Sequence, residues 1–319
     1  MLEKHKTCAI LVETRKEMDM LETRVLRYFL AVAREGSITA AAQSLHVTQP
    51  TLSRQLMDLE DELGQKLFVR GSHHVSLTPE GILLRKRASE ILDLVGKTES
   101  EFSSMGENIA GDVYIGSGET DAMNRIAAVI REIGRDYPDV HFHIYSGNAE
   151  DVMDRLDKGM LDFGILIQPV DIAKYNALNL PEKDVWGVAM RRDCPLAKKK
   201  RITKDDLLGY PLIFSRQVAQ SSPVKNPCID WFAGNYKKLN IVATYNLIYN
   251  AALLVKSGLG VAITLDKLLN VSTNSDLVFR PLEPRLESGL DIVWKKYQVF
   301  SSAAELFLAR MRKQIASAP

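Results

Sequence analysis

The chain has 319 residues, of which 46% are hydrophobic and 25% are charged, and its net charge of +1 gives no overall attraction to nucleic acid. This length predicts two or three domains with packed cores. We find no signal-peptide pattern and no apolar run long enough to cross a bilayer, and three widely separated cysteines predict no disulfide framework, so we expect a cytoplasmic protein that does not bind membranes.

Residues 37–64 have the pattern of two short helices separated by a tight turn, preceded by a helix over residues 21–34. Ser37 and Thr48 are suited to cap the two short helices through their hydroxyls, and Pro50 falls in the first turn of the second, where a missing N–H costs nothing. Apolar residues at helical spacing predict the buried face of that helix: Leu52, Leu56, Leu59 and Leu63. This is the pattern of a helix-turn-helix, whose second helix enters the DNA major groove.

Polar side chains on the exposed face of that second helix predict a surface that reads DNA. Arginine can pair with guanine and glutamine with adenine, while short hydroxyls reach phosphate oxygens. A hairpin with a basic turn follows at residues 66–77, and we expect its tip to lie against the DNA backbone. A helical hairpin used only for packing is the alternative. The predicted DNA-binding residues are Ser37, Thr39, Thr48, Gln49, Pro50, Thr51, Ser53, Arg54, Gln55, Arg70 and His73.

The stretch LRYFLAVAREGSITAAAQSLHVTQPTLSRQLMDLEDELGQKLFVR, followed by VSLTPEG, resembles the N-terminal module of LysR-type transcriptional regulators, and weaker similarity extends over about residues 20–315. The resemblance implies a winged helix-turn-helix, a linker helix that dimerises and an effector domain built like a periplasmic binding protein. It also implies binding to double-stranded promoter DNA, self-association as a dimer or tetramer, and a small-molecule effector. RNA polymerase is a further candidate partner.

We expect an N-terminal extension at residues 1–19, a winged helix-turn-helix at 20–78 and a linker helix at 79–106. The sequence leaves open whether the extension is a flexible tail or reflects a start codon assigned too early. The linker helix carries apolar residues at heptad spacing: Leu84, Ala88, Ile91, Val95, Thr98 and Phe102. A single exposed apolar seam needs a partner, which favours a second copy of the chain; packing on its own domain is the alternative.

From residue 111 to residue 319, strands alternate with helices, which predicts a parallel, doubly wound α/β effector domain. We expect one lobe at about residues 111–168 and 279–319 and an inserted second lobe at about 169–278. Strands are predicted at 113–115, 140–145, 162–167, 185–190, 212–214, 260–265, 277–282 and 290–294. Helices are predicted at 121–137, 149–159, 230–238, 247–257 and 303–314.

The cleft between the lobes is the predicted ligand site, because open α/β sheets bind ligands at the carboxyl ends of their strands. Ser117 and Thr120 precede a helix whose first N–H groups suit an anion such as a carboxylate. Glu119 complicates that interpretation and favours an amine-bearing or zwitterionic effector. The predicted effector-binding residues are Ser117, Glu119, Thr120, Ser146, Asn148, Ser215, Arg216, Gln217, Asn246 and Tyr249. Each of them is also of a type that serves as an ordinary loop or cap residue.

The sequence offers no recognisable catalytic constellation. It lacks a phosphate-binding loop, a dinucleotide fingerprint, a Cys-x-x-Cys pair and a nucleophile elbow, so we expect neither an enzyme nor a cofactor. His141 and His143 share one strand face but lack an evident third metal ligand, and neither Cys194 nor Cys228 lies in a run that lowers a thiol pKa. The alternative is a two-lobed solute-binding or enzymatic protein with an accessory DNA module; the missing signal peptide opposes the first and the missing catalytic groups the second.

Overall fold

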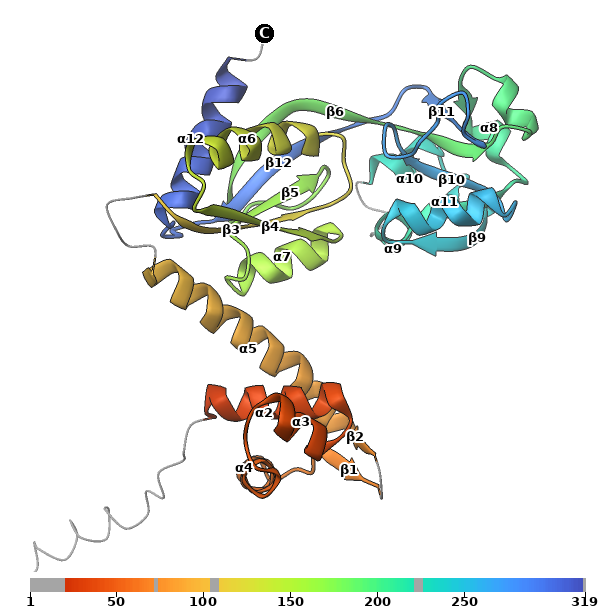
Figure 1. The fold of residues 1–319 in the computed structure, drawn as a ribbon. Helices are drawn as coiled ribbons and strands as arrows, with labels where there is room; N and C mark the ends of the chain where they lie inside the picture. The colour runs from red at the N-terminus through yellow and green to blue at the C-terminus, as the bar shows by residue number, and fades with distance from the viewer. Residues whose placement is uncertain (1–20, 72–73, 104–108, 221–225, 318–319) are drawn as a thin grey trace, which may run out of the picture. The chain divides into compact units, whose positions relative to one another are not determined.

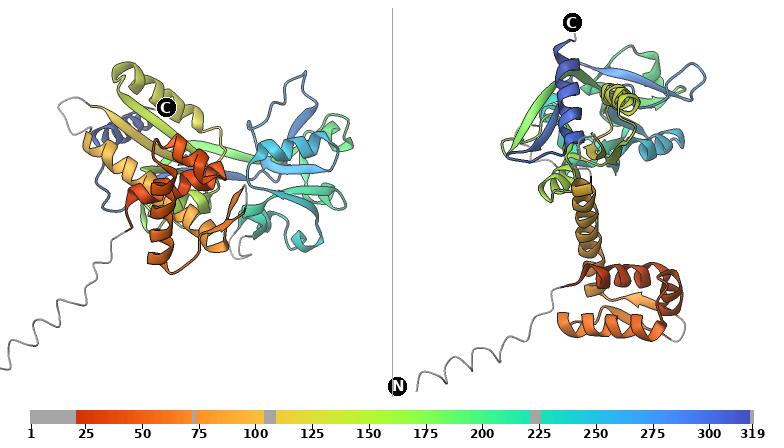
Figure 2. Two further views of the ribbon diagram at one scale, coloured as in Figure 1. Left: turned by 60° about the horizontal axis from the view of Figure 1, so that its bottom comes forward. Right: turned by 60° about the vertical axis from the view of Figure 1, so that its left-hand side comes forward.

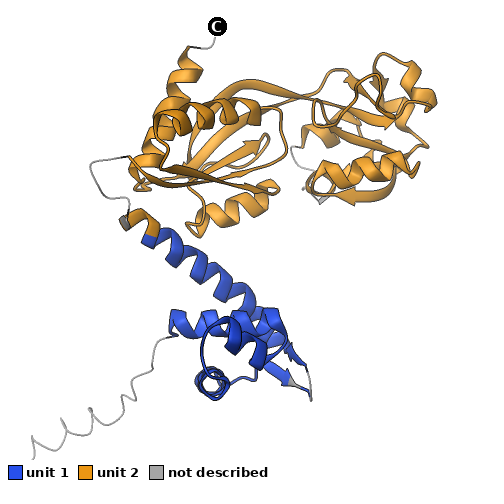
Figure 3. Ribbon diagram, viewed as in Figure 1, with its two compact units in different colours: residues 1–99 blue, residues 100–319 orange. Residues whose placement is uncertain are grey.

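A computed structural model of the chain describes residues 21–71, 74–103, 109–220 and 226–317. The chain divides into two compact units, residues 1–99 and residues 100–319 (Figure 3). None of the helices within the described ranges combines the length and the hydrophobicity needed to span a lipid bilayer.

Unit 1 is a helix-turn-helix followed by a small hairpin and the start of a long helix (Figure 1). Its elements are α2 (Thr23–Glu35), α3 (Ile38–Ser44), α4 (Gln49–Leu63), β1 (Phe68–Arg70), β2 (Val75–Leu77) and α5 (Pro79–Ser103). The two strands pair antiparallel and form the predicted wing. Leu26 and Phe29 of α2 pack on Leu52 and Leu56 of α4, and this buried cluster is the reason why the three short helices hold together.

The two helices of the helix-turn-helix end with the same hydrogen-bond pattern. After α3, the N–H of His46 donates to Gln43 O at 3.2 Å and that of Val47 to Ala42 O at 3.0 Å. After α4, the N–H groups of Gly64 and its successor make the equivalent bonds to the third- and fourth-last helical carbonyls. Both motifs place one residue in the left-handed region, His46 at φ 55° and Gly64 at φ 63°. The predicted stop at Gly64 is therefore confirmed, and the tight turn uses a histidine in a conformation that favours glycine.

The apolar seam predicted along the linker helix α5 is divided between two environments. Its first members, Leu84 and Ala88, pack into the core of unit 1 instead of facing a partner. Thr98 is exposed, and its hydroxyl donates to Leu94 O at 2.8 Å. The large apolar side chains that α5 leaves exposed are Ile82, Leu83, Ile91, Leu94 and Phe102. The exposed apolar surface therefore keeps Ile91 and Phe102 of the predicted seam and adds Ile82, Leu83 and Leu94, while the helix-turn-helix core covers the seam's first turns.

The first lobe of unit 2 is a five-stranded sheet covered by helices on both faces (Figure 1). Its strand order is β4-β3-β5-β12-β6, in which β3 is parallel to β4 and β5 and β12 is antiparallel to β5 and β6. Helices α6 and α12 pack on one face of the sheet and α7 on the other. The elements are β3 (Gly111–Ser117), α6 (Met123–Asp136), β4 (Val140–Ser146), α7 (Ala149–Asp157), β5 (Phe163–Ile167), β6 (Tyr175–Arg191), β12 (Glu287–Lys295) and α12 (Ser302–Ala316).

The second lobe is built on the far half of β6, which runs from one lobe into the other (Figures 1 and 2). Here β6 pairs antiparallel with β10 and β11, while β10, β8 and β9 are mutually parallel neighbours. The remaining elements are β7 (Ile202–Thr203), α8 (Lys204–Leu207), β8 (Pro211–Ser215), α9 (Arg216–Gln220), α10 (Pro227–Trp231), β9 (Asn240–Tyr245), α11 (Ile248–Lys256), β10 (Val261–Leu265), β11 (Leu277–Glu283) and the 3-10 turns η1 (Pro195–Lys198) and η2 (Tyr236–Lys238).

Both crossovers between the lobes lie later in the chain than the expected boundaries at residues 168 and 278. Residues 175–180 still pair with β12 in the first lobe, and pairing resumes at Asp184 after an irregular stretch. β11 still pairs with β6 in the second lobe up to Pro281. Residues 181–184 contain a proline and three charged side chains, which resemble a loop although the backbone stays extended. The helix predicted at 230–238 is also interrupted, because Ala233 and Gly234 take positive φ angles between α10 and η2.

Candidate DNA-reading face and effector cleft

The N-terminus of α4 presents the polar face that the sequence predicts. Thr48 caps the helix by accepting from the N–H of Thr51 at 3.3 Å, and the two hydroxyls lie 2.8 Å apart. Ser37 caps α3 in the same way, accepting from the N–H of Ala40 at 3.3 Å. Arg54 is exposed and makes no ion pair with the described residues. The face therefore offers a free guanidinium beside pre-positioned hydroxyls, which suits hydrogen bonding to base edges and phosphates.

The predicted DNA-binding residues are not all equally accessible in unit 1. Thr39, Thr48, Gln49, Pro50, Thr51 and Arg54 are exposed, and Ser37, Ser53 and Gln55 are half-buried. Arg70 lies at the end of β1, where the structure describes only its backbone, and His73 lies outside the described residues. The exposed residues lie at the cap and in the first two turns of α4, except for Thr39, which lies on α3.

Glu60 of α4 is a structural residue that the sequence analysis missed. Its carboxylate is buried and accepts from the N–H of Leu67 at 2.8 Å and of Phe68 at 3.2 Å, while Lys66 Nζ lies 3.1 Å away. Burial opposes ionisation, but these donors outweigh it and hold the pKa of Glu60 below its usual range. Glu60 therefore fixes the start of the wing against the helix that carries the DNA-reading face.

A cleft between the two lobes of unit 2 contains about 920 Å³ of empty space, including its open mouth. It lies where the parallel strands of both lobes reach their carboxyl ends, as predicted for an open α/β sheet. Its described polar lining consists of Glu119, Asn148, Gln168, Ser215, Gln217, Asn226, Asn246, Thr264 and Ser288. Its apolar lining includes Ile165, Ile167, Trp186, Val218, Ile248, Leu265 and Leu268. A space of this kind suits a small molecule with an apolar body and a few polar groups.

Glu119 links the two lobes at this cleft. It belongs to the first lobe, and its Oε2 accepts from the N–H of Ile248, the first residue of α11 in the second lobe. A carboxylate at a helix N-terminus satisfies a donor that has no partner inside the helix and interacts favourably with the helix dipole. The acid that the sequence analysis regarded as an obstacle to an anion site thus occupies a helix N-terminus itself.

The structure brings half of the predicted effector-binding residues to the cleft. Those that line it are Glu119, Asn148, Ser215, Gln217 and Asn246. Arg216 and Tyr249 are exposed and do not line it; each lies in the first turn of a helix, α9 and α11, with its side chain in solvent. The lining residues that the prediction missed include Gln168, Trp186 and Asn226. Of these, Asn226 could have been predicted as a helix cap from the sequence, because an asparagine before a proline is typical of a helix start.

Ser117 and Thr120 are not among the residues that line this cleft, and their role in effector binding stays a prediction. Both are buried, at 2% and 6% exposure, and border an adjoining hollow together with Ser146; this hollow shares Glu119 and Ile248 with the cleft. The hydroxyl of Ser117 donates to Gly118 O at 2.7 Å. The hydroxyl of Thr120 accepts from the N–H of Ala122 at 3.1 Å, and it also acts to lower the pKa of the Asp184 carboxyl. These hydrogen bonds stabilise the turn between β3 and α6.

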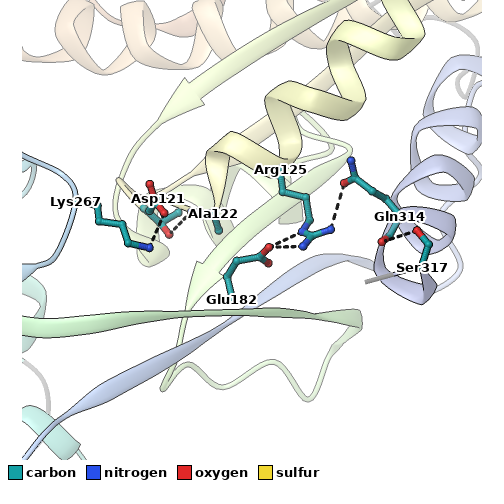
Figure 4. A network of polar contacts seen from close by, with 8 residues as sticks. Asp121, Ala122, Arg125, Glu182, Lys267, Gln314 and Ser317 are labelled. Atoms are coloured by element: carbon teal, nitrogen blue, oxygen red, sulfur yellow. Dashed lines mark hydrogen bonds and ion pairs between the residues drawn. The ribbon is translucent and has the colours of Figure 1, made fainter. Parts of the chain in front are cut away.

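Charged side chains connect the first lobe to the crossover strand β6 and to the second lobe (Figure 4). Lys267 of the second lobe lies 2.9 Å from Asp121 of the first. Arg125 of α6 pairs with Glu182 of β6 at 2.5 Å and also reaches Gln314 of α12. These ion pairs, with the Glu119 contact, hold the described arrangement of the two lobes, and a ligand that changes the arrangement must rearrange some of them.

Beside this network, Asp184 of β6 is 2% exposed and its Oδ2 has no hydrogen-bond partner among the described residues. Burial, which the Thr120 hydroxyl only partly offsets, raises the pKa of Asp184 to about 6, and the nearby Asp266 and Asp121 add to the increase. Asp184 is therefore a carboxyl group whose charge at neutral pH destabilises the crossover.

The other candidate chemical groups have structural partners. His143 Nε2 lies 2.9 Å from Asp112 Oδ1, and its ring stacks on Tyr114 with 4.6 Å between centroids. Within the part of the chain that the structure describes, no three His, Cys, Asp or Glu side chains form a group that suits a metal ion. Burial raises the pKa of the Cys228 thiol to about 12, which disfavours the reactive thiolate.

Comparison with known families places both units in one kind of protein. The family described as "Bacterial regulatory helix-turn-helix protein, lysR family" matches residues 23–82. The family described as "LysR substrate binding domain" matches residues 106–316. The two matches together cover almost all of the described chain.

Individual relatives match along most of their length. The Hca operon transcriptional activator HcaR of Escherichia coli is 30% identical over 300 residues, which are 93% of this chain and 99% of HcaR. The HTH-type transcriptional regulator YvbU of Bacillus subtilis is 28% identical over 292 residues, 91% of this chain and 97% of YvbU. A crystal structure of the LysR family regulator CbnR has a TM-score of 0.70 at 18% identity, covering 92% of this chain and 99% of CbnR. CbnR with its target DNA gives 0.69 at 21% identity over the same shares. These two structures bear on the fold.

Proposed function

The chain belongs to the LysR family of transcriptional regulators, and we propose that it reads promoter DNA through α4 and adjusts that binding to a small molecule held between the lobes of unit 2. It acts by binding and not by catalysis, in keeping with relatives that are named as transcriptional regulators and activators.

The exposure of Arg54 on α4 is the observation that best supports the DNA-reading part of the proposal. Arg24 and Arg34 on α2 each lie 3.0 Å from a neighbouring glutamate, whereas Arg54 points into solvent from the first half of α4 with no described partner. A free guanidinium on a recognition helix can donate two hydrogen bonds to guanine. Gln49 and Gln55 flank it and supply the donor and acceptor pair that suits adenine.

A homodimer through α5 is the proposed assembly, with a tetramer as its extension. Leu83 is 60% exposed and Ile91 and Leu94 are each 41% exposed along one helix. Isolated exposed apolar residues are ordinary, but a row of them along a long helix favours a coiled-coil-like partner. A dimer also supplies two recognition helices for two DNA half-sites.

The effector part of the proposal rests on the cleft, which joins residues of both lobes. A molecule that touches both lobes changes regulation only if it binds one lobe arrangement better than another. The contacts of Glu119 with α11 and of Asp121 with Lys267 differ between such arrangements, because each joins the two lobes. RNA polymerase remains a candidate partner, as expected from the sequence.

The test is a binding titration of the full-length protein with labelled DNA from upstream of its own gene, against random DNA of equal length. We expect preferential binding to the upstream DNA, and a change in affinity or footprint when a metabolite that raises the protein's melting temperature is added. Equal affinity for the two DNAs at several salt concentrations would contradict the DNA-reading part. Metabolites that stabilise the protein without any effect on DNA binding would contradict the regulatory part.

A further inference from the structure

We propose that the molecule bound in the cleft carries a protonated amine on an apolar body, and that the carboxylate of Glu119 binds the amine. This inference rests on the effector-binding function proposed above and names the chemical class of the effector. Glu119 is the one charged side chain among the described residues that line the cleft; the basic side chain of Arg216, on the neighbouring helix, is exposed outside it.

Glu119 has a carboxylate oxygen to spare. Its Oε2 accepts from the N–H of Ile248, and its Oε1 makes no hydrogen bond to any described residue. The side chain is half-buried at the cleft wall, where a charge-assisted hydrogen bond is stronger than in water. An ammonium group at Oε1 would compensate the negative charge that the N-terminus of α11 balances only in part.

Three of the helix N-termini at the cleft, those of α7, α10 and α11, offer an anion little. Asn148 caps α7 by accepting from the N–H of Asp151 at 3.0 Å. Asn226 caps α10 by accepting from the N–H of Cys228 at 3.0 Å and of Ile229 at 3.4 Å. Glu119 takes the first N–H of α11. At three of the helices whose first turns line the cleft, side chains of the protein already satisfy donors that a carboxylate ligand would use.

The walls of the cleft suit an apolar body attached to the amine. The indole N–H of Trp186 donates to Ser288 Oγ at 2.9 Å, and the hydroxyl of Tyr245 donates to Ile263 O at 2.7 Å. Their polar atoms are thus bonded within the protein, and the rings present carbon to the cleft. Leu265 and Leu268 lie on the same side. The remaining polar side chains around Ser215 can bind a hydroxyl, amide or carboxylate elsewhere on the ligand. A simple amine and an amino acid both fit this description, because both carry the ammonium group that Glu119 binds.

Matched sets of compounds test the charge directly on the full-length protein. One set is L-phenylalanine, phenethylamine and hydrocinnamate, which share a skeleton and carry both charges, the amine alone and the carboxylate alone. A second set is L-leucine, isoamylamine and isocaproate. Binding is followed by calorimetry and by the intrinsic tryptophan fluorescence, to which Trp186 in the cleft contributes. In at least one set, the amine-bearing members should bind about tenfold or more tightly than the matched carboxylate. The simple amine and the amino acid are then distinguished by which of them binds better.

Glu119→Gln is the decisive variant, because its side-chain oxygen can still accept from the N–H of Ile248 while the charge is removed. It should abolish the preference for amines, while loss of the charge at the N-terminus of α11 lowers the melting temperature by only about 1–4 °C. Glu150→Gln, an exposed acid on α7 outside the cleft, is the matched control and should keep the preference. Tighter binding of the carboxylates, a preference that survives Glu119→Gln, or no binding of any amine at millimolar concentration would each overturn the inference. DNA binding is measured on the same samples, so that loss of the amine preference with intact DNA reading leaves the proposed function standing.

Discussion

Replacing Asp184 with Asn should stabilise unit 2 at neutral pH. Burial, with the nearby acids Asp266 and Asp121, raises the pKa of this carboxyl from 3.8 to about 6, and one of its oxygens has no partner. At about 1.4 kcal/mol per pKa unit, keeping the group ionised costs unit 2 about 3 kcal/mol. The pKa of Asp184 is higher in the native state than in the unfolded state, so Asp184 favours folding most when its carboxyl is protonated, below the ordinary pKa of 3.8. This favourable contribution to the free energy of unfolding is lost as the pH rises through the native-state pKa of about 6.

Asparagine has the same shape without the charge, and its oxygen can still accept from the hydroxyl of Thr120. We therefore expect Asp184→Asn to raise the free energy of unfolding of unit 2 by about 2–3 kcal/mol at about pH 7.5, and by almost nothing at about pH 4, where the wild-type carboxyl is protonated. The same change should leave the ion pair between Asp121 and Lys267 in place.

The assay uses the three tryptophans of the chain, Trp186, Trp231 and Trp294, which all belong to unit 2. Their fluorescence during urea titration follows this unit within the full-length protein, and a pH series gives the stability difference between wild type and variant. Asp139→Asn, at an exposed position of the same unit, is the control and should give a small difference at every pH. A stability difference that stays constant across the series, or an Asp184→Asn variant less stable than wild type at neutral pH, would refute the reasoning.

Three further predictions concern unit 1. Glu60→Ala leaves the N–H groups of Leu67 and Phe68 without their acceptor and should lower the free energy of unfolding by about 1–3 kcal/mol. The hydrogen exchange of these two amides should accelerate; unchanged protection would mean that the carboxylate does not hold the wing. His46→Gly should stabilise the helix-turn-helix and Gly64→Ala should destabilise it, each by about 1 kcal/mol in denaturation followed by circular dichroism, because both positions are left-handed; effects of the same sign would contradict this. Ile91→Asp combined with Leu94→Asp should dissociate the oligomer in sedimentation experiments, and an unchanged sedimentation coefficient would place the contact elsewhere.

Local signals in the sequence were sufficient for unit 1. Ser37, Thr48 and Gly64 carry the caps and the stop in their own chemistry, and each takes the predicted role. The spacing of Leu52, Leu56 and Leu59 predicted the buried face correctly, although Leu63, the last of the stripe, is 37% exposed. The hydrophobic pattern alone did not reveal which neighbour covers Leu84 and Ala88, because a seam looks the same whether its own domain or a partner packs on it.

The position of the cleft could be predicted from the sequence, but the side chains that line it could be predicted only in part. The carboxyl ends of the strands gave the position, and Glu119, Asn148 and Ser215 follow three of those strands. Whether a hydroxyl points into the cleft depends on bonds that form across the turn, so the sequence did not reveal that Ser117 and Thr120 make hydrogen bonds within the turn. The sequence did not predict that β6 continues from one lobe into the other, because a proline followed by charged residues is typical of a loop. Only the pairing of β6 with β12 and with β10 shows that the strand is continuous.

The central claim, that α4 reads specific DNA, is tested most directly by the affinity of Arg54→Ala for its operator and for random DNA of equal length. We expect Arg54→Ala to lose about 1–3 kcal/mol of binding free energy on the operator and to change little on random DNA. Arg34→Ala, which removes an arginine already paired with Glu35, should leave both affinities nearly unchanged. An equal loss on the two DNAs would make Arg54 a phosphate contact, and no loss on either would remove it from the interface.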